Sequence, residues 1–425
     1  MAQQQPRRVL RVAPPGRGGA RAEAERGEEG EAVFATVQAA VDAVPVGNRV
    51  RTVIRLAPGT YREPVYVAKA KNLVTLSGEA GSPEATVITW DNTATRIKHS
   101  QSSRVIGTGT FGCGTVIVEG EDFIAENITF ENSAPQGSGQ AVALRVTADR
   151  CAFYNCRFLG WQDTLYLHYG KQYLRDCYIE GNCDFIFGNS IALLEHCHIH
   201  CKSAGYITAH SRKSSSETTG YVFLRCIITG NGEAGYMFLG RPWGPFGRVV
   251  FAHTFMDRCI KPAGWHNWDR SENERTACFF EYRCSGPGFR PSNRVAWCRQ
   301  LLDVEVENFL SHSFIDPDLD RPWLIQMMAI KTMKDWFDPT MRIHVLLEVY
   351  PGKKGDGMAD GVGVLIPAIS AIYSVWVKGY GRQRLGNDQN GKPLGSKHSD
   401  CDQPAAGRLI PYRANNEAAR LTVTC

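Results

Sequence analysis

The chain has 425 residues, of which 43% are hydrophobic, and a formal net charge of +5 at pH 7. That length can bury a large core. The charge is too small for a nucleic-acid footprint, and no lysine–arginine stripe with interleaved aromatic residues occurs, so we expect no nucleic-acid partner. The most apolar stretch, Gly361–Val377, is shorter than the roughly 20 residues of a membrane span and is interrupted by Pro367, so we expect no membrane association.

Residues 1–30 are rich in proline, glycine, arginine and glutamate, a composition that predicts a disordered lead-in. The same residues contain no continuous apolar segment of the kind found in signal peptides. The sequence therefore leaves a cytoplasmic location or unconventional export open beside an extracellular one.

A helix is predicted directly after the lead-in, because apolar residues recur there at helical spacing. These residues are Phe34, Val37, Ala40, Val41 and Val44. Pro45 ends the pattern. An amphipathic helix in front of a repetitive β-structure is expected to cap its open end, where strand edges and core would otherwise be exposed.

From Arg51 to about Cys284 the chain alternates short β-patterned runs with glycine, asparagine and serine turns. Five of these runs share one pattern, namely a polar residue, a small or apolar residue, a variable residue and a large apolar residue. They are 127–130, 155–158, 176–179, 196–199 and 225–228, separated by steps of 28, 21, 20 and 29 residues. A period of this size indicates stacked supersecondary units. Because the units contain strands and no helix, the sequence predicts an all-β parallel β-helix.

Fourteen cysteines would permit disulfide bonds. Four of them, however, occupy the small inward position of the repeat: Cys156, Cys177, Cys197 and Cys226. Buried free cysteine behaves as a small hydrophobic residue, whereas disulfide frameworks are expected mainly in short secreted chains. We therefore favour stacked free thiols in the core. No CxxC pair with zinc-like spacing occurs, so we expect no structural metal.

Two aspartates lie in short β-patterned segments one repeat apart, Asp163 in Trp161–Tyr166 and Asp184 in Asp184–Gly188. They are separated by 21 residues, and Gln140 and Gln162 are separated by 22. These are the steps of the cysteine repeat, so stacking should bring all four side chains to one outer face over three successive coils. The spacing alone predicts this constellation.

The last third of the sequence loses the repeat. Residues 287–323 are less regular, and an outer helix is indicated by Val304, Val306, Phe309 and Leu310. Residues 332–425 contain a glycine- and lysine-rich run and a long polar run. We interpret residues 31–331 as one β-helix domain and residues 332–425 as an atypical, poorly ordered C-terminal extension.

Five ordered motifs resemble the signatures of plant pectin methylesterases, and the resemblance covers roughly residues 33–331. They are Gly59–Glu63, Gln140–Arg145, Gln162–Tyr166, Asp184–Gly188 and Leu239–Trp243. The chain resembles the subgroup that lacks an N-terminal inhibitor-like pro-region. The resemblance implies the family's single-stranded right-handed parallel β-helix, a pectin lyase-like solenoid.

The resemblance implies an aspartyl esterase that hydrolyses the C6 methyl esters of homogalacturonan in cell wall modification and pectin catabolism, without a cofactor or metal. Asp184 would be the nucleophile and Asp163 the general acid and then base, with Gln140 and Gln162 binding the oxyanion. Because two adjacent carboxylates cannot cheaply both ionise, one pKa should rise and the other stay low. Arg241 would keep Asp184 ionised.

Substrate contact would come from Trp243, Trp161 and Tyr166, which resemble sugar-binding aromatic residues. For Trp161 a core position is the competing interpretation, and Tyr166 could instead pack below the groove. Gln140 could belong to an internal glutamine ladder, and Arg241 could be a surface arginine. Two residues depart from the family's pattern, His210 in place of a glutamine and Cys183 in place of a small aliphatic residue.

The resemblance also implies methyl-esterified homogalacturonan as the partner, a monomer, and an extracellular location at the cell wall, with a pectinesterase inhibitor protein as a candidate partner. Two alternatives from other functional classes stay open. One is a β-helix enzyme that cleaves the pectin chain, because glycosidases also use paired carboxylates. The other is a non-catalytic pectin-binding protein.

Overall fold

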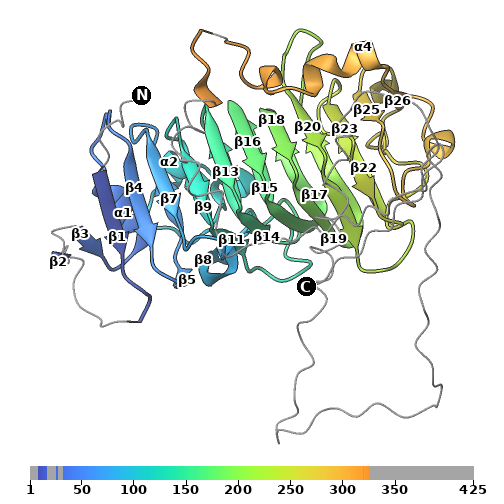
Figure 1. Ribbon diagram of the computed structural model, residues 1–425. Helices are drawn as coiled ribbons and strands as arrows, with labels where there is room; N and C mark the ends of the chain where they lie inside the picture. Colours follow the sequence, from blue (N-terminus) through green and yellow to red (C-terminus); the bar gives the residue numbers. More distant parts are fainter. Residues whose placement is uncertain (1–7, 17–24, 27–31, 319, 325–425) are drawn as a thin grey trace, which may run out of the picture. The chain divides into compact units, whose positions relative to one another are not determined.

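Parallel strands wind into a β-helix, as the repeat predicts. The computed structural model describes residues 8–16, 25–26, 32–318 and 320–324. Each coil contributes strands to three ladders. The first ladder runs along the face shown in Figure 1. Its parallel strands are β1 (Arg8–Val12), β3 (Ala32–Phe34), β4 (Thr52–Leu56), β7 (Val74–Ser77), β10 (Ile124–Glu126), β13 (Cys151–Tyr154), β16 (Lys171–Arg175), β18 (Ile191–Glu195), β20 (Gly220–Leu224), β23 (Arg248–Ala252), β25 (Cys278–Tyr282) and β26 (Arg299–Gln300), and β2 (Glu25–Arg26) pairs antiparallel with β3.

The second and third ladders share two long strands, β17 (Tyr178–Gly188) and β19 (His198–His210), which belong to one ladder at their start and to the other at their end. The second ladder also contains β5 (Gly59–Arg62), β8 (Thr86–Trp90), β11 (Thr129–Asn132), β14 (Arg157–Leu159), β21 (Ile227–Gly230) and β24 (Phe255–Met256). The third contains β6 (Val65–Val67), β9 (Val116–Val118), β12 (Leu144–Thr147), β15 (Leu165–Tyr169) and β22 (Met237–Pro242).

The register of the second ladder follows the repeat read from the sequence. Thr129 pairs with Arg157, Arg157 with Tyr178, Tyr178 with His198, and His198 with Ile227, which reproduces the steps of 28, 21, 20 and 29 residues. The polar residue that opens each run adopts a left-handed backbone, with φ between 48° and 55° at Asn127, Asn155, Asp176, His196 and Arg225. Asparagine and aspartate tolerate this conformation best, which explains the polar position of the repeat.

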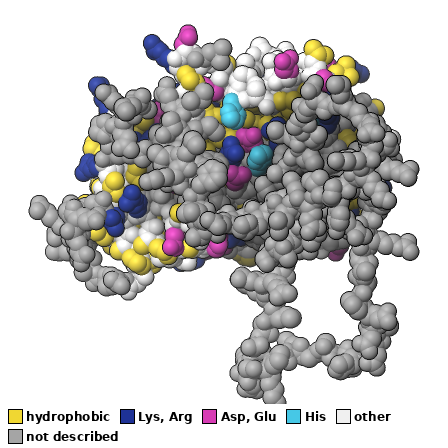
Figure 2. Space-filling model, in the orientation of Figure 1, with side chains coloured by type: hydrophobic (Ala, Val, Ile, Leu, Met, Phe, Trp, Pro, Cys, Tyr) yellow, Lys and Arg dark blue, Asp and Glu magenta, His cyan; other side chains and the backbone are white. Residues whose placement is uncertain are grey.

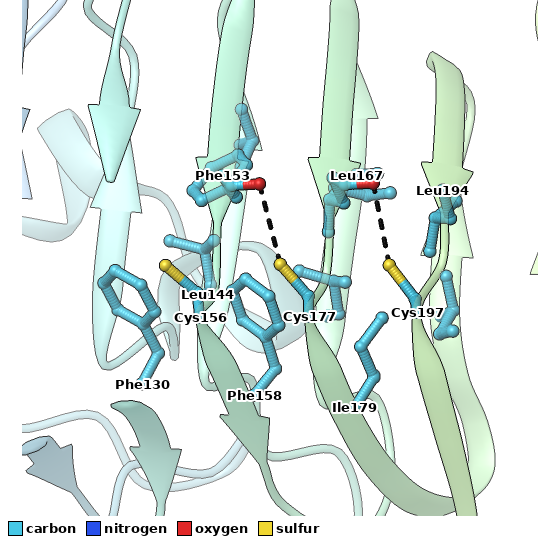
Figure 3. Packing of buried hydrophobic residues seen from close by; sticks show 14 of the residues in the cluster. Phe130, Leu144, Phe153, Cys156, Phe158, Leu167, Cys177, Ile179, Leu194 and Cys197 are labelled. Carbon is cyan, nitrogen blue, oxygen red and sulfur yellow. Dashed lines mark hydrogen bonds between the residues drawn. The ribbon is translucent and has the colours of Figure 1, made fainter. Parts of the chain in front are cut away.

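The predicted cysteine stack is confirmed. Cys156, Cys177, Cys197 and Cys226 form no disulfide bonds and are almost fully buried among the apolar side chains between the three ladders. The thiol of Cys177 donates to the carbonyl of Phe153 in the preceding coil at 3.6 Å, as Figure 3 shows. Each cysteine thus fills the core and also satisfies its weak donor.

The predicted N-terminal helix is present as α1 (Val37–Asp42), capped by the side chain of Thr36. Its buried residues Val37, Ala40 and Val41 join the core at the end of the solenoid that holds β1, β3 and β4. The prediction of a disordered lead-in is wrong for residues 8–12. Leu10 and Val12 alternate with exposed neighbours and are 2% exposed, and β1 pairs with β4. The surrounding arginine- and proline-rich composition concealed this alternation.

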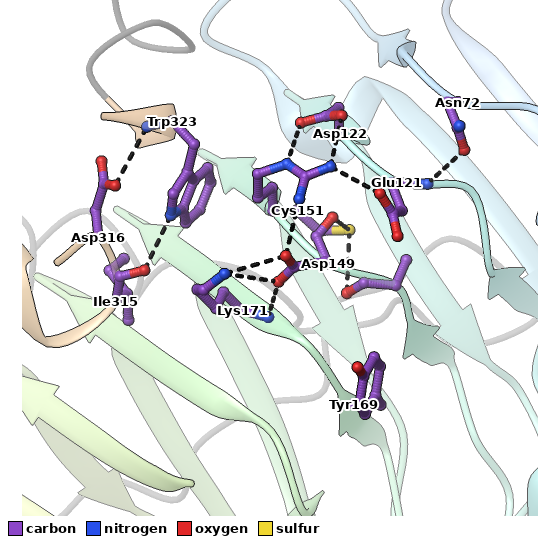
Figure 4. Close-up of polar contacts among 12 residues, drawn as sticks. Asn72, Glu121, Asp122, Asp149, Cys151, Tyr169, Lys171, Ile315, Asp316 and Trp323 are labelled. Atoms are coloured by element: carbon purple, nitrogen blue, oxygen red, sulfur yellow. Dashed lines mark hydrogen bonds and ion pairs between the residues drawn. The ribbon is translucent and has the colours of Figure 1, made fainter. Parts of the chain in front are cut away.

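The remaining helices are short. They are α2 (Ser103–Ile106), α3 (Gly109–Gly112) and α4 (Asp303–Val306), with 3-10 turns η1 (Pro83–Ala85), η2 (Ser271–Arg275), η3 (Pro291–Asn293), η4 (Glu307–Phe309) and η5 (His312–Phe314). The predicted helix over residues 304–310 is therefore one α-turn followed by a 3-10 turn. Val306, Ile315, Trp323 and Leu324 belong to a second apolar cluster on the outer face of the first ladder. Figure 4 shows the indole N–H of Trp323 donating to the carbonyl of Ile315.

Ion pairs line the outer turns of the first ladder. Arg150 bonds to Glu121, Asp122 and Asp149. Lys171 bonds to Asp149 from the next coil, as Figure 4 shows. Figure 2 shows acidic, basic and histidine side chains next to one another near the middle of the same face.

The chain divides into two units after Lys331. The predicted C-terminal extension, residues 332–425, lies outside the described residues. None of the helices described is long and apolar enough to cross a membrane.

Candidate active site

The candidate site lies on the outer face of the third ladder, at the point where chain segments enter it from the second. Asp163 lies just before β15, Asp184 lies within β17, and Arg241 lies near the end of β22. The pairing of β17 with β15 and of β19 with both β17 and β22 sets these three residues on neighbouring coils. The stacking predicted from the 21-residue step therefore brings the two carboxyl groups to the same face.

Both aspartates adopt a left-handed backbone, with φ of 62° at Asp163 and 47° at Asp184. This conformation is uncommon for residues other than glycine, and aspartate and asparagine are the side chains that tolerate it best. The backbone N–H of Asp163 donates to the carbonyl of Cys183 at 3.0 Å, so the turn that aims one carboxyl group is fixed against the strand that carries the other.

Arg241 holds Asp184 in a bidentate pair. Its Nε donates to Oδ1 at 2.9 Å and its Nη2 to Oδ2 at 2.6 Å. Planar two-point pairs of this kind are among the strongest charge-assisted hydrogen bonds in proteins. The guanidinium lies between the rings of Tyr206 and Trp268, at 3.9 and 3.8 Å from their centroids, which fixes its plane. The alternative that Arg241 is merely a surface arginine is therefore wrong.

The two carboxyl groups are equally buried, each residue being 7% exposed, but they differ in their partners. Asp163 has no hydrogen-bond partner for its carboxyl group among the described residues. Burial raises its pKa well above the usual range, and the charge of Asp184 raises it further, against a smaller opposing effect of Arg241. For Asp184 burial also raises the pKa, but the hydrogen bonds and charge of Arg241 act in the opposite direction.

We expected one pKa to rise and the other to stay low, and this holds only in part, because burial raises both. The asymmetry comes from Arg241, which bonds Asp184 directly and Asp163 not at all. The arrangement therefore favours a protonated Asp163 beside an ionised Asp184, the usual way in which two neighbouring carboxyl groups divide acid and nucleophile roles.

Gln140 and Gln162 lie on successive coils beside the aspartates. The N–H of Ala141 donates to the carbonyl of Gln162 at 3.1 Å, and Gln162 forms a parallel bridge with Cys183. Both glutamines are partly exposed, and neither side-chain amide bonds to another described residue. Their side-chain N–H donors are thus unoccupied by the described residues.

Aromatic rings border the site. Trp243 is 44% exposed and lies 6.1 and 6.5 Å from the rings of Phe187 and Tyr166. Tyr166 is 6% exposed and stacks on Phe187 with a centroid distance of 4.2 Å. Trp161 is partly buried, and the ammonium of Lys202 covers one face of its indole at 3.8 Å.

The two residues that depart from the family's pattern have different surroundings. His210 is fully buried, and its Nδ1 accepts the backbone N–H of Arg248 at 3.2 Å. Burial lowers the pKa of His210 to about 3, so it acts as a neutral acceptor that closes the turn. Cys183 lies 3.8 Å from Nη2 of Arg241, and burial raises the pKa of its thiol to about 12, which disfavours the reactive thiolate.

Within the described part of the chain, no group of three or more His, Cys, Asp or Glu side chains could hold a metal ion. Sequence reasoning missed Tyr206 and Trp268, which flank Arg241. Tyr206 pairs with Cys183 in the register of β17 and β19, so the repeat contained a signal for it. Trp268 follows the last strand of the ladder in an irregular segment, and no spacing indicates it.

The sequence model of one protein family, described as Pectinesterase, matches residues 24–318. Pectinesterase 31 of Arabidopsis thaliana is 72% identical over 305 residues, which cover 72% of this chain and 96% of that protein.

Solved structures of pectin methylesterases are also similar to this chain. Pectin methylesterase from carrot has a TM-score of 0.63 and 31% identity, covering 77% of this chain and 96% of its own. A pectin methylesterase in complex with a hexasaccharide has a TM-score of 0.59 and 25% identity, covering 72% of this chain and 96% of its own.

Proposed function

This chain belongs to the pectinesterase family, and on that premise we propose how its residues remove the C6 methyl esters of homogalacturonan. The reaction converts methyl-esterified pectin and water to pectate and methanol. The observation that carries the mechanism is the contrast between the two neighbouring carboxyl groups, one bonded at both oxygens by Arg241 and the other without a partner among the described residues.

Asp184 is the nucleophile in this proposal. One of its carboxylate oxygens attacks the ester carbonyl carbon of a galacturonate unit and forms a tetrahedral intermediate. Carboxylates serve as covalent catalysts when they are held in place. Arg241 supports this role because it keeps Asp184 ionised and fixes its plane with two hydrogen bonds.

Asp163 supplies the proton. Its raised pKa favours the protonated carboxyl group, which can protonate the departing methoxide as the C–O bond breaks. The products of this step are methanol and an acyl-enzyme on Asp184. Asp163, now ionised, takes a proton from water, and the resulting hydroxide attacks the acyl carbon. The galacturonic acid unit leaves and ionises by releasing its proton to solvent, Asp184 is regenerated, and Asp163 again carries a proton.

The oxyanion of each tetrahedral intermediate needs donors, and we assign this role to the side-chain amides of Gln140 and Gln162. Their lack of partners among the described residues supports the assignment, because a preorganised donor must be unoccupied before substrate arrives. Gln140 as a member of an internal ladder is the weaker interpretation, because its amide makes no bond to Gln162.

Trp243 is the sugar-stacking residue that exposure favours, since almost half of it is open to solvent. Tyr166 acts below it by stacking on Phe187 and supporting the face on which Trp243 rests. Trp161 presents only one free ring face, because Lys202 covers the other, and we assign it to the support of the loop rather than to the sugar.

A single assay tests the function against its alternatives. Purified protein is incubated with highly methyl-esterified homogalacturonan, and methanol, reducing ends and unsaturated ends are measured together. Methanol without new chain ends is expected. New ends would indicate a chain-cleaving enzyme, and binding without any product would indicate a pectin-binding protein.

Location and further partners follow from the substrate only as proposals. A cell-wall polymer as substrate supports an extracellular site of action. Microscopy of the tagged protein tests this proposal, since fluorescence confined to the cytoplasm would contradict it. Action as a monomer is tested by light scattering of the purified chain. A pectinesterase inhibitor protein as partner is tested by titrating methanol release with such an inhibitor.

A further inference from the structure

The loop Gly160–Thr164 connects β14 to β15 and carries two of the proposed catalytic groups, Gln162 and Asp163. Asp163 has a left-handed backbone, and its carboxyl group bonds to no other described residue. The direction of this carboxyl group therefore depends on the contacts that hold the loop around it.

Lys202, in β19 one coil beyond the second aspartate, contacts this loop in two ways. Its ammonium donates to the carbonyl of Gly160 at 3.1 Å and lies 3.8 Å from the centre of the Trp161 indole. Both contacts fall on the two residues immediately before Gln162. The hydrogen bond fixes the position of the Gly160 carbonyl, and the cation–π contact fixes the orientation of the Trp161 indole.

Glu180, in β17, completes the arrangement. Its Oε1 accepts from the ammonium of Lys202 at 2.8 Å and its Oε2 accepts from the hydroxyl of Tyr178 at 2.9 Å. The backbone carbonyl of the same glutamate accepts from the hydroxyl of Thr164 at 3.0 Å, directly after Asp163. The Lys202–Glu180 ion pair thus holds both ends of the loop. Lys202 contacts the residues before Gln162 and Asp163, and the carbonyl of Glu180 contacts the residue after them.

Building on the proposed function, we propose that Lys202 is a positioning residue for the esterase reaction, which holds Gln162 and Asp163 in reach of the ester through Gly160 and Trp161. Its ammonium does not touch the reacting atoms. Misplacement of a catalytic group by about 1 Å costs on the order of 100-fold in rate, so loss of this restraint should lower kcat strongly.

The chain offers a matched control. Lys171 forms an ion pair with Asp149 at 3.0 Å in the first ladder, and the side-chain exposures of that pair, 29% and 22%, are close to the 21% and 18% of Lys202 and Glu180. Asp163 lies before β15, whereas Lys171 lies after the other end of that strand, and its described contacts do not include the loop. A stability effect common to all such ion pairs would appear equally in both lysine variants.

The experiment compares K202M, K202R and K171M with the parent protein in methanol release from methyl-esterified homogalacturonan and in thermal unfolding. We expect kcat of K202M to fall about 10- to 100-fold with KM changed by less than about threefold. K202R should recover at least a third of the parent kcat, since arginine can still bond Gly160 and Glu180. K171M should keep the parent kcat.

A kcat of K202M within twofold of the parent would overturn the proposal, as would equal losses of kcat in K202M and K171M. Should K202M fail to fold, E180Q decides the matter, because it weakens the anchor of Lys202 and is expected to lower kcat several-fold; an unchanged kcat overturns the proposal. The parent protein in the same assay separates this outcome from a failure of the proposed function, since a parent that releases no methanol contradicts the function itself.

Discussion

Arg241 and Asp184 are 57 residues apart in the sequence and form a two-point ion pair, with Nε–Oδ1 and Nη2–Oδ2 distances of 2.9 and 2.6 Å. The ion pair connects β22 to β17 across β19, which lies between them. Arg241 bonds only one of the two adjacent carboxyl groups. Its hydrogen bonds and charge act to lower the pKa of Asp184, whereas Asp163 receives only the weaker effect of the Arg241 charge.

Replacing Arg241 should move the acidic limb of the pH profile. Arg241 acts to lower the pKa of Asp184, so its loss raises that pKa, and the ionised nucleophile is lost at a higher pH. We expect R241M to shift the acidic limb of kcat/KM upward in pH and to lower the maximum. R241K, which keeps the charge but loses the bidentate geometry, should shift it less.

The pH profile of kcat/KM is measured as methanol release from about pH 4 to about pH 9, under conditions first order in substrate. An acidic limb that stays in place in R241M would mean that Asp184 is not the group whose ionisation limits the reaction.

Asp163→Asn should inactivate the enzyme and also stabilise the fold near neutral pH. Asparagine keeps the left-handed backbone but cannot donate the proton, so a large loss of kcat is expected. A carboxyl group with a raised pKa in the folded state stabilises the protein below its ordinary pKa of 3.8, and this stability is lost as pH rises through the folded-state pKa. The asparagine variant avoids that loss.

Thermal unfolding as a function of pH measures this effect. Tm of D163N should exceed that of the parent at neutral pH by roughly 2 °C for each unit of pKa shift. The two curves should converge below the ordinary pKa of 3.8. A variant that is less stable than the parent at neutral pH would show that the carboxylate is well accommodated there.

The two glutamines should act on kcat rather than on KM. Gln140→Ala and Gln162→Ala each remove one proposed oxyanion donor, which typically costs about 10²–10³ in kcat. Because the oxyanion forms only in the tetrahedral intermediate, substrate binding should change little. Steady-state kinetics on the same homogalacturonan decides the point. A rise in KM with an unchanged kcat would place the amides in ground-state binding.

A chain that ends at Lys331 should keep its activity, because the family match covers only residues 24–318. We expect kcat/KM for methanol release and Tm within error of the full chain. A large loss of either quantity would show that the last 94 residues contribute to the enzyme.

Much of the site was predictable from spacing. The steps of about 20 to 29 residues predicted that Asp163, Asp184 and the two glutamines share one face, because a ladder of parallel strands carries residues one coil apart to neighbouring positions. The buried cysteine stack followed from the same register. The ladder also explains why the polar first residue of each run is tolerated, since the turn needs a left-handed backbone there.

Other features depend on contacts that no periodicity encodes. Of the two rings that flank Arg241, Trp268 comes from an irregular segment whose position no spacing indicates. Lys202, from a strand 41 residues later, covers one face of Trp161, and no spacing indicates this contact. Strand β1 was missed because five alternating residues are a weak signal within a highly charged segment.

The most direct test of the central claim is the rate of methanol release by Asp184→Asn, with Asp176→Asn as its control. Both positions have a left-handed backbone, with φ of 47° and 54°, so asparagine should leave both folds intact. We predict that D184N loses at least about 10³-fold in kcat at an unchanged Tm, while D176N stays active. A folded D184N that keeps more than about a tenth of the parent kcat would contradict the assignment of Asp184 as the nucleophile.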